Sequence, residues 1–209
     1  MGTKRVGLAR VEALLENLKR DIRWGDGTSF STYDANDVGT GFDGAETCNV
    51  KVFKQNGEIV TTIMVDITGL ADSGTVKDVI GEGSGTAAAY MTRITTAVNG
   101  IIYRAEIACV ELPAGTNAEL DIDLVTSSDS LAESALYDSG TTEVALVPAT
   151  ADWTAGAFRQ SADGLDCTNI SANSHYVYLA NGSGADSGGT YTAGKFIIKL
   201  YGAESDSSW

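Results

Sequence analysis

The chain has 209 residues, a formal net charge of −14 and 43% hydrophobic residues. This apolar content is enough to build a core and excludes wholesale disorder, while the length accommodates one large domain or one domain with an appendage. The acidity excludes nucleic acid and anionic membranes as partners of the main body, because like charges repel one another.

The first residues differ from the rest in charge and in pattern. Residues 1–23 carry six basic and three acidic side chains, a net charge of +3, which leaves −17 for the remainder. Apolar residues recur there at alternating steps of three and four, which predicts an amphipathic helix with a heptad seam. The seam consists of Leu8, Val11, Leu15, Leu18 and Ile22, and Leu14 widens it. Because Gly25 supplies a helix stop, we predict a helical arm over residues 1–24 and a β-body over residues 25–209.

The arm needs a surface to pack on, because an isolated helix of this length is marginal in water. Packing on the chain's own body and packing against symmetry mates or a larger assembly both remain open, and we favour the second. The predicted assembly interface combines the seam and Leu14 with the basic residues Lys4, Arg5 and Arg10.

From about residue 47 the apolar pattern changes to a period of two, which is typical of strands. Residues 48–69 contain two strand-like runs joined by Asn56-Gly57, a strong hairpin signal. Residues 93–112 repeat this pattern around Asn99-Gly100, so we predict a second hairpin there. In the second run of the first hairpin, the alternation places five residues on one face, namely Ile59, Thr61, Ile63, Val65 and Ile67.

Further strands are predicted over residues 118–125, 141–148, 174–180 and 194–202, with loop helices near residues 75–82 and 149–156. About eight strands without alternating helices favour a mainly β protein over a parallel α/β fold. The fold we expect is an antiparallel two-sheet sandwich, jelly-roll-like, preceded by one N-terminal amphipathic α-helix.

The sequence contains only weak signals for a catalytic site. Cys48, Cys109 and Cys167 lack C-x-x-C spacing, so we expect buried free thiols. The single histidine, His175, is expected at a strand edge or cap rather than as a general base. No signal-peptide pattern and no apolar run of about 18 residues occurs, so we expect neither secretion nor a membrane span.

Two patterns are compatible with calcium. Residues 34–39 (DANDVG) depart from an EF-hand loop at Val38. Glu119, Asp121 and Asp123 alternate with apolar residues, and we predict an acidic, solvent-facing row there, with a calcium site as the alternative.

Aromatic residues leave one more alternative open. A sugar-stacking face of Tyr176, Tyr178 and Tyr191 is possible, but packing in the core or at an interface explains these residues more simply. We therefore predict no catalytic residue, no cofactor and no metal site, and we predict that the protein is not an enzyme.

Several segments resemble virion structural proteins of marine tailed bacteriophages. They are GTKRVGLARVEALLENLKRDI at the start, then TTIMVDITGL, ITTAVNGIIY and ELPAGTNAELDIDL, and finally YTAGKFIIKLYG near the end. The resemblance covers most of the chain in order, and it contains no catalytic signature.

The resemblance implies a capsid decoration (cement) protein on the virion surface, assembled in the host bacterial cytoplasm. Its implied partners are the major capsid protein or other virion proteins and further copies of itself, with a homotrimer favoured. The alternative is an appendage or fibre-like binding module that contacts host-surface carbohydrate. A hydrolase using two acidic residues is a third, disfavoured hypothesis.

Overall fold

The structure, a computed structural model, describes residues 38–42, 47–55, 57–83, 85–140, 142–148, 151–162, 170, 174–182 and 187–204. The predicted helical arm and its boundary after residue 24 lie outside these residues, as do Cys167 and most of the DANDVG loop. The same holds for the whole predicted assembly interface, Lys4, Arg5, Leu8, Arg10, Val11, Leu14, Leu15, Leu18 and Ile22.

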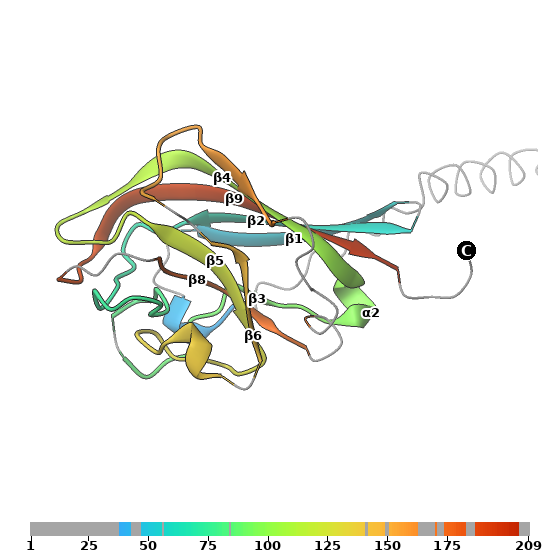
Figure 1. Cartoon of the computed structure of the whole chain (residues 1–209), viewed down its shortest axis with the longest axis horizontal. Coiled ribbons are helices and arrows are strands. Elements are labelled where there is room, and N and C mark those ends of the chain that lie inside the picture. Colours follow the sequence, from blue (N-terminus) through green and yellow to red (C-terminus); the bar gives the residue numbers. More distant parts are fainter. Residues whose placement is uncertain are drawn as a thin grey trace, which may run out of the picture.

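The described residues form two antiparallel sheets (Figure 1). The five-stranded sheet has the order β1-β2-β9-β4-β7 and the four-stranded sheet the order β3-β8-β5-β6. The first contains β1 (Thr47–Gln55), β2 (Glu58–Asp66), β9 (Tyr191–Ala203), β4 (Ile101–Gly115) and β7 (Phe158–Gln160). The second contains β3 (Thr92–Arg93), β8 (Tyr176–Asn181), β5 (Ile122–Ser127) and β6 (Glu143–Val147). The helical elements whose bounds fall within the described residues are short, namely η2 (Thr40–Phe42), α2 (Thr96–Asn99) and η3 (Tyr137–Ser139).

One apolar core lies between the two sheets. Ile63 and Ile198 from the five-stranded sheet and Leu124 and Leu179 from the four-stranded sheet belong to the same buried cluster. Figure 1 shows the five-stranded sheet stacked over the four-stranded one. The prediction of a mainly β protein with two antiparallel sheets is therefore confirmed.

The first predicted hairpin is present. Gln55 pairs with Glu58, so β1 and β2 are joined by two residues, and Gly57 has a φ of 81°, as a type I′ turn requires. The residues predicted to share one face of β2 do so, and this face lies inward, since Ile59, Thr61, Ile63, Val65 and the following Ile67 are all buried.

The second predicted hairpin, around Asn99-Gly100, is wrong. Residues 96–99 form α2, and Gly100, with a φ of 69°, follows it as the C-cap. The strands on either side belong to different sheets, because β3 pairs with β8 whereas β4 pairs with β9 and β7. Asn-Gly also suits a helix end, and here it serves a crossover between the sheets.

The two loop helices are also not found in the described residues. In residues 75–82 the backbone makes isolated bridges, from Asp78 to Leu136 and from Val79 to Ala180, and Lys77 has a φ of 70°. Residues 151–156 form bends and a turn. In residues 75–82, backbone pairing with neighbouring segments takes the place of the internal hydrogen bonds that a helix would form.

The two sheets differ in how their faces are covered. A second apolar cluster lies on the far face of the four-stranded sheet, where Val79, Leu131 and Tyr137 from loops pack against Val125 and Tyr178 from strands. All six residues of β5 are consequently buried. On the five-stranded sheet, the face turned away from the core carries several exposed apolar side chains. This outer face is therefore the place to look for a binding surface.

Trp153 links the two sheets. Its Nε1 donates a hydrogen bond to the Ile122 carbonyl oxygen at 2.8 Å, and its ring packs edge-on against Phe196 at a centroid distance of 5.5 Å. The side chain is 1% exposed. It thus joins the start of β5 to the middle of β9 through one buried group.

We expect Trp153→Ala to lower the free energy of unfolding by about 3–5 kcal/mol, because it leaves a large cavity and an unpaired carbonyl oxygen. The matched control is Phe158→Ala on the outer face, where we expect a change within about 0.5 kcal/mol. Urea denaturation followed by far-UV circular dichroism measures both. A loss of less than 1 kcal/mol for Trp153→Ala would contradict the linking role.

Candidate functional site

An apolar stripe crosses the outer face of the five-stranded sheet at right angles to the strands. Strand register aligns its members, since Ile197 on β9 pairs with Met64 on β2 and with Ala108 on β4, and Ala108 pairs with Phe158 on β7. Val110 lies two residues further along β4. We call these five residues the apolar stripe. Val110 and Phe158 are each 56% exposed and Ile197 is 36% exposed, so the stripe faces solvent.

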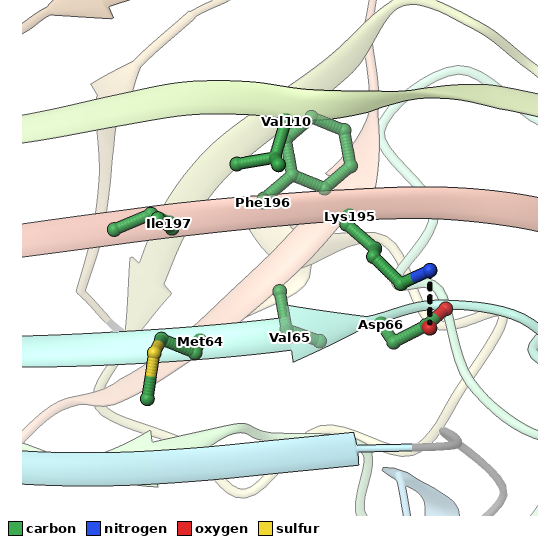
Figure 2. A pocket seen from close by; sticks show the side chains of 7 residues that line it. All are labelled: Met64, Val65, Asp66, Val110, Lys195, Phe196 and Ile197. Carbon is green, nitrogen blue, oxygen red and sulfur yellow. Dashed lines mark ion pairs between the residues drawn. The ribbon is translucent and has the colours of Figure 1, made fainter.

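A shallow groove of about 210 Å³ runs beside the stripe, between β2, β9 and β4. Figure 2 shows Met64, Ile197 and Val110 along it, with Lys195 and Asp66 at one end. Its lining is Met64, Val65, Asp66, Val110, Lys195, Phe196 and Ile197. The groove is thus lined mostly by apolar residues and is open to solvent.

Charged side chains border the groove at that end. Lys195 Nζ lies 2.6 Å from Glu111 Oε2 and 3.3 Å from Asp66 Oδ2. The hydrogen bonds to Glu111 and then to Asp66 raise the pKa of Lys195 above its usual value. Burial acts to raise the pKa of Asp66, but hydrogen bonds from Thr68 and Lys195 outweigh it and hold that pKa low. Lys195 and Asp66 are therefore both ionised at neutral pH.

On the other side of the stripe lies a tyrosine cluster. The Tyr103 hydroxyl donates to Glu58 Oε1 at 2.7 Å, and the Tyr201 hydroxyl donates to Glu106 Oε2 at 2.8 Å. Arg104 pairs with Glu106, and its guanidinium carbon lies 5.0 Å from the centroid of the Tyr201 ring. Tyr103 is 51% exposed. The cluster combines an exposed aromatic ring with carboxylates and a guanidinium, groups that can contact a polar ligand.

The acidic row predicted to face solvent is buried instead. Glu119, Asp121 and Asp123 are 8%, 4% and 6% exposed, because loops cover the far face of the four-stranded sheet. Backbone amides stabilise this arrangement, since Glu119 Oε1 accepts hydrogen bonds from the N–H groups of Leu120 and Asp121, both at 2.9 Å. The prediction of an acidic solvent face is therefore wrong.

Asp72 extends this buried network of carboxylates. Its Oδ1 accepts a hydrogen bond from the Gly74 N–H at 2.9 Å, and its Oδ2 accepts one from the Glu119 N–H at 3.0 Å. The Tyr191 hydroxyl donates to the Glu119 carbonyl oxygen at 2.8 Å. Within the described ranges, no group of three or more His, Cys, Asp or Glu side chains has a geometry that could hold a metal ion. The carboxylates here organise loops.

His175 is fully buried directly before β8. Its Nδ1 lies 3.2 Å from the Thr126 hydroxyl oxygen, and its Nε2 has no hydrogen-bond partner in the part of the chain that the structure describes. Burial lowers the pKa of the imidazole below its ordinary value, although the nearby Asp129 acts in the opposite direction. The ring is therefore a neutral core group, remote from the outer face.

The predicted state of the cysteines is confirmed for two of them. Cys48 and Cys109 are free thiols, the first half-buried and the second buried. Burial raises the pKa of Cys48 to about 12, and it also raises that of Cys109. Neither thiol is a nucleophile at neutral pH.

The tyrosines considered for sugar stacking do not form an exposed face. Tyr178 and Tyr191 are buried, and Tyr176 packs against Tyr90 at a centroid distance of 4.7 Å. Among the residues that the structure describes, the exposed aromatic side chains are those of Tyr103 and Phe158, which were not predicted.

A sequence signal for the outer face does exist. Phe196, Ile197 and Ile198 are consecutive, and so are Cys109 and Val110. Since neighbouring residues of a strand point to opposite faces, such runs require apolar side chains on both faces of the sheet.

Comparison of the chain with protein-family models, with curated proteins and with solved structures finds no match. The helices that the structure describes include none with the length and apolar character needed to cross a bilayer.

We expect the stability of the protein to fall between pH 7.5 and pH 5.5 because of His175. The folded state holds its pKa below the unfolded value of about 6.5, so the unfolded chain binds more protons in this window. The contribution is complete above pH 6.5, and it is lost as the pH falls towards the folded pKa, with a slope of at most about 1.4 kcal/mol per pH unit.

Urea denaturation of the wild type and of His175→Gln at pH 7.5, 6.5 and 5.5 measures this effect. The variant should show the smaller decrease, because its side chain does not titrate. Parallel decreases in both proteins would show that other groups, such as the many carboxylates, cause the pH dependence.

Proposed function

We propose that this chain is a structural binding protein, and specifically a decoration (cement) protein of a bacteriophage head. The observation that carries the proposal is the apolar stripe, which is exposed on an ordered sheet face. Exposed contiguous apolar patches on folded proteins mark contact surfaces, because water is displaced from them favourably on association. The resemblance of the chain to virion structural proteins indicates which assembly supplies the contacts.

The shape of the surface favours a macromolecular partner. The groove measures about 210 Å³, which is below the volumes of about 300–1,000 Å³ of pockets that enclose small ligands. It opens onto a sheet face with further exposed side chains at Tyr103 and Phe158. A broad, shallow surface of this kind suits another protein. The proposal assigns no catalytic residue and no cofactor.

The partners we propose are the major capsid protein or other virion proteins, together with further copies of this chain, most simply in a trimer. The location is the capsid surface, reached after assembly in the host cytoplasm. The residue ranges proposed as functional parts remain the arm, residues 1–24, and the body, residues 25–209. The acidic body and the basic arm are compatible with a protein that attaches by one part and is displayed by the other.

The finer architecture belongs to the same proposal. The chain moves between the sheets repeatedly, from β2 to β3, from β3 to β4, from β4 to β5 and again from β6 through to β9. Alternation between two packed sheets is the pattern of a jelly roll. We infer that the body is a jelly-roll-like sandwich with one added strand in the five-stranded sheet.

The test is co-sedimentation with empty heads assembled from the major capsid protein of the same genome. We expect saturable binding by the full-length protein and at least a tenfold loss of affinity in Ile197→Glu, which places a charge in the stripe. Thr62→Glu is the matched control, because Thr62 lies on the same face between Lys51 and Lys199 and outside the stripe. If the full-length protein stays in the supernatant at every concentration, the decoration proposal is wrong.

A second candidate function rests on the tyrosine cluster. An exposed tyrosine ring beside carboxylates can stack on a sugar and accept hydrogen bonds from its hydroxyl groups. The cluster lies on the same outer face as the stripe, so it is available to a fibre-like module that contacts host-surface carbohydrate.

On a glycan array, this second candidate predicts that the full-length protein retains at least one glycan. Tyr103→Ala should then reduce the signal at least tenfold, whereas Phe158→Ala, an exposed aromatic residue in the stripe, should leave it unchanged. An array without signal, or equal retention by both variants, would count against a carbohydrate ligand.

A further inference from the structure

We propose that the apolar stripe is the docking site for residues 3–23 of a second copy of this chain. The inference rests on the proposed function only in treating the stripe as an assembly surface, and it assigns the stripe to contacts between copies of this chain, so that Ile197→Glu would weaken head binding through loss of the oligomer. It names the partner segment, and it requires no head or shell protein. Two apolar surfaces then cover each other, the stripe on the body and the heptad seam of the arm.

The arm is the chain segment that needs such a site. Its sequence predicts five apolar side chains along one side of a helix, from Leu8 to Ile22, and such a helix is stable only when this side is packed. The core between the two sheets is already filled, and loops fill the far face of the four-stranded sheet. Among the described residues, the large apolar side chains that form one continuous exposed surface lie on the outer face. They include Val110, Phe158 and Ile197.

The dimensions of the two surfaces agree. From Met64 on β2 to Phe158 on β7 the stripe crosses three strand spacings, about 14 Å between backbones, and the side chains at its ends extend it. A helical seam from Leu8 to Ile22 is about 21 Å long at 1.5 Å per residue. The stripe therefore matches the central two to three turns of the predicted helix.

Charge favours the arm over the body of another copy as the occupant. Residues 1–23 carry a net charge of +3, whereas the remainder of each copy carries −17. The outer face itself carries both signs, with Lys195 and Lys199 as well as Asp66 and Glu111, so the attraction arises from the net charge of the whole body. An arm approaching a body brings opposite net charges together, whereas two bodies bring like net charges together. The attraction is screened by salt, but the apolar contact is not weakened in this way.

The position of the first described residues permits exchange between copies. Gly39 and Gly41 donate hydrogen bonds to the carbonyl oxygens of Tyr90 and Ala88, and these residues precede the edge strand β3 of the four-stranded sheet. In Figure 1 the blue η2 turn accordingly lies on the side of that sheet, away from the outer face of β9 and β4. Residues 24–37 can span up to about 45–50 Å when extended, which is enough to reach a neighbouring copy.

Limited trypsin digestion of the purified full-length protein, without heads, tests the proposal. The arm offers six cleavage sites, at Lys4, Arg5, Arg10, Lys19, Arg20 and Arg23. Mass spectrometry at successive times reports cleavage at these sites, and light scattering reports the mass of the same samples. We expect the arm of the wild type to be cut at least ten times more slowly than that of Ile197→Glu.

Two further variants make the result specific. Leu15→Glu changes the seam without altering the body, and we expect the same loss of protection as in Ile197→Glu. Thr62→Glu, on the outer face but outside the stripe, should keep the protection of the wild type. Circular dichroism of each variant establishes that its body is folded. On dilution, protection and oligomer mass should disappear together.

Two outcomes would overturn the inference. Equal cleavage of the wild type and Ile197→Glu would mean that the arm does not occupy the stripe. Protection that persists in a particle with the mass of one chain would mean that the arm packs on its own body. Failure of head binding with arm protection intact would instead refute the decoration proposal and leave this inference standing.

Discussion

The position of β9 between β2 and β4 is the constraint on which the rest of the structure depends. Nine consecutive residue pairs connect it to β2, and β4 pairs with it on the other side over most of its length. This double pairing fixes the register, so Phe196, Ile198 and Leu200 point into the core. A shift of one residue would exchange the two faces and place Lys195 and Lys199 in the core, which the cost of burying charge forbids. The exposure of Ile197 follows from the same register.

The chain's acidity has two different structural uses. Some carboxylates lie at the surface, where they pair with lysines, as Glu111 does with Lys195, but several are buried among loops. Asp72 and Glu119 accept hydrogen bonds from backbone N–H groups and thereby hold the loops that precede β5 and follow β2. Carboxylates suit this task because they only accept hydrogen bonds, and loop backbones have N–H groups that no sheet satisfies. Net charge alone therefore overstates the acidic surface.

Uneven coverage of the two sheets connects the fold with the proposed function. Loops from residues 70–91 and 128–140 cover the four-stranded sheet, so its central strands β5 and β8 are buried on both faces. The five-stranded sheet has only one face on the core, and register places an apolar row across its other face. Another chain can pack on such an apolar row. The segment of this sequence that we propose for that role is the basic arm of a second copy, because it has an apolar seam.

The sequence by itself determined the features that depend on neighbouring residues. It predicted the β1–β2 hairpin, because Asn-Gly selects a tight turn, and it predicted that Ile59, Ile63 and Val65 share one face of β2, because side chains alternate along a strand. It also predicted a mainly β body with two antiparallel sheets. The arm, residues 1–24, stays a prediction from its heptad spacing.

Only the tertiary structure decided how distant segments meet. Asn99-Gly100 ends α2 rather than closing a hairpin, because the flanking strands find partners in different sheets. The alternation of Glu119, Asp121 and Asp123 indicated a solvent face, but loops distant in sequence cover it and supply backbone N–H donors. The run from Phe196 to Ile198 indicated that apolar side chains lie on both faces of β9 at this point of the strand. Pairings between strands far apart in the chain decide which residue of this run faces outward. The same pairings place Met64, Ala108 and Phe158 beside it, and no local pattern encodes them.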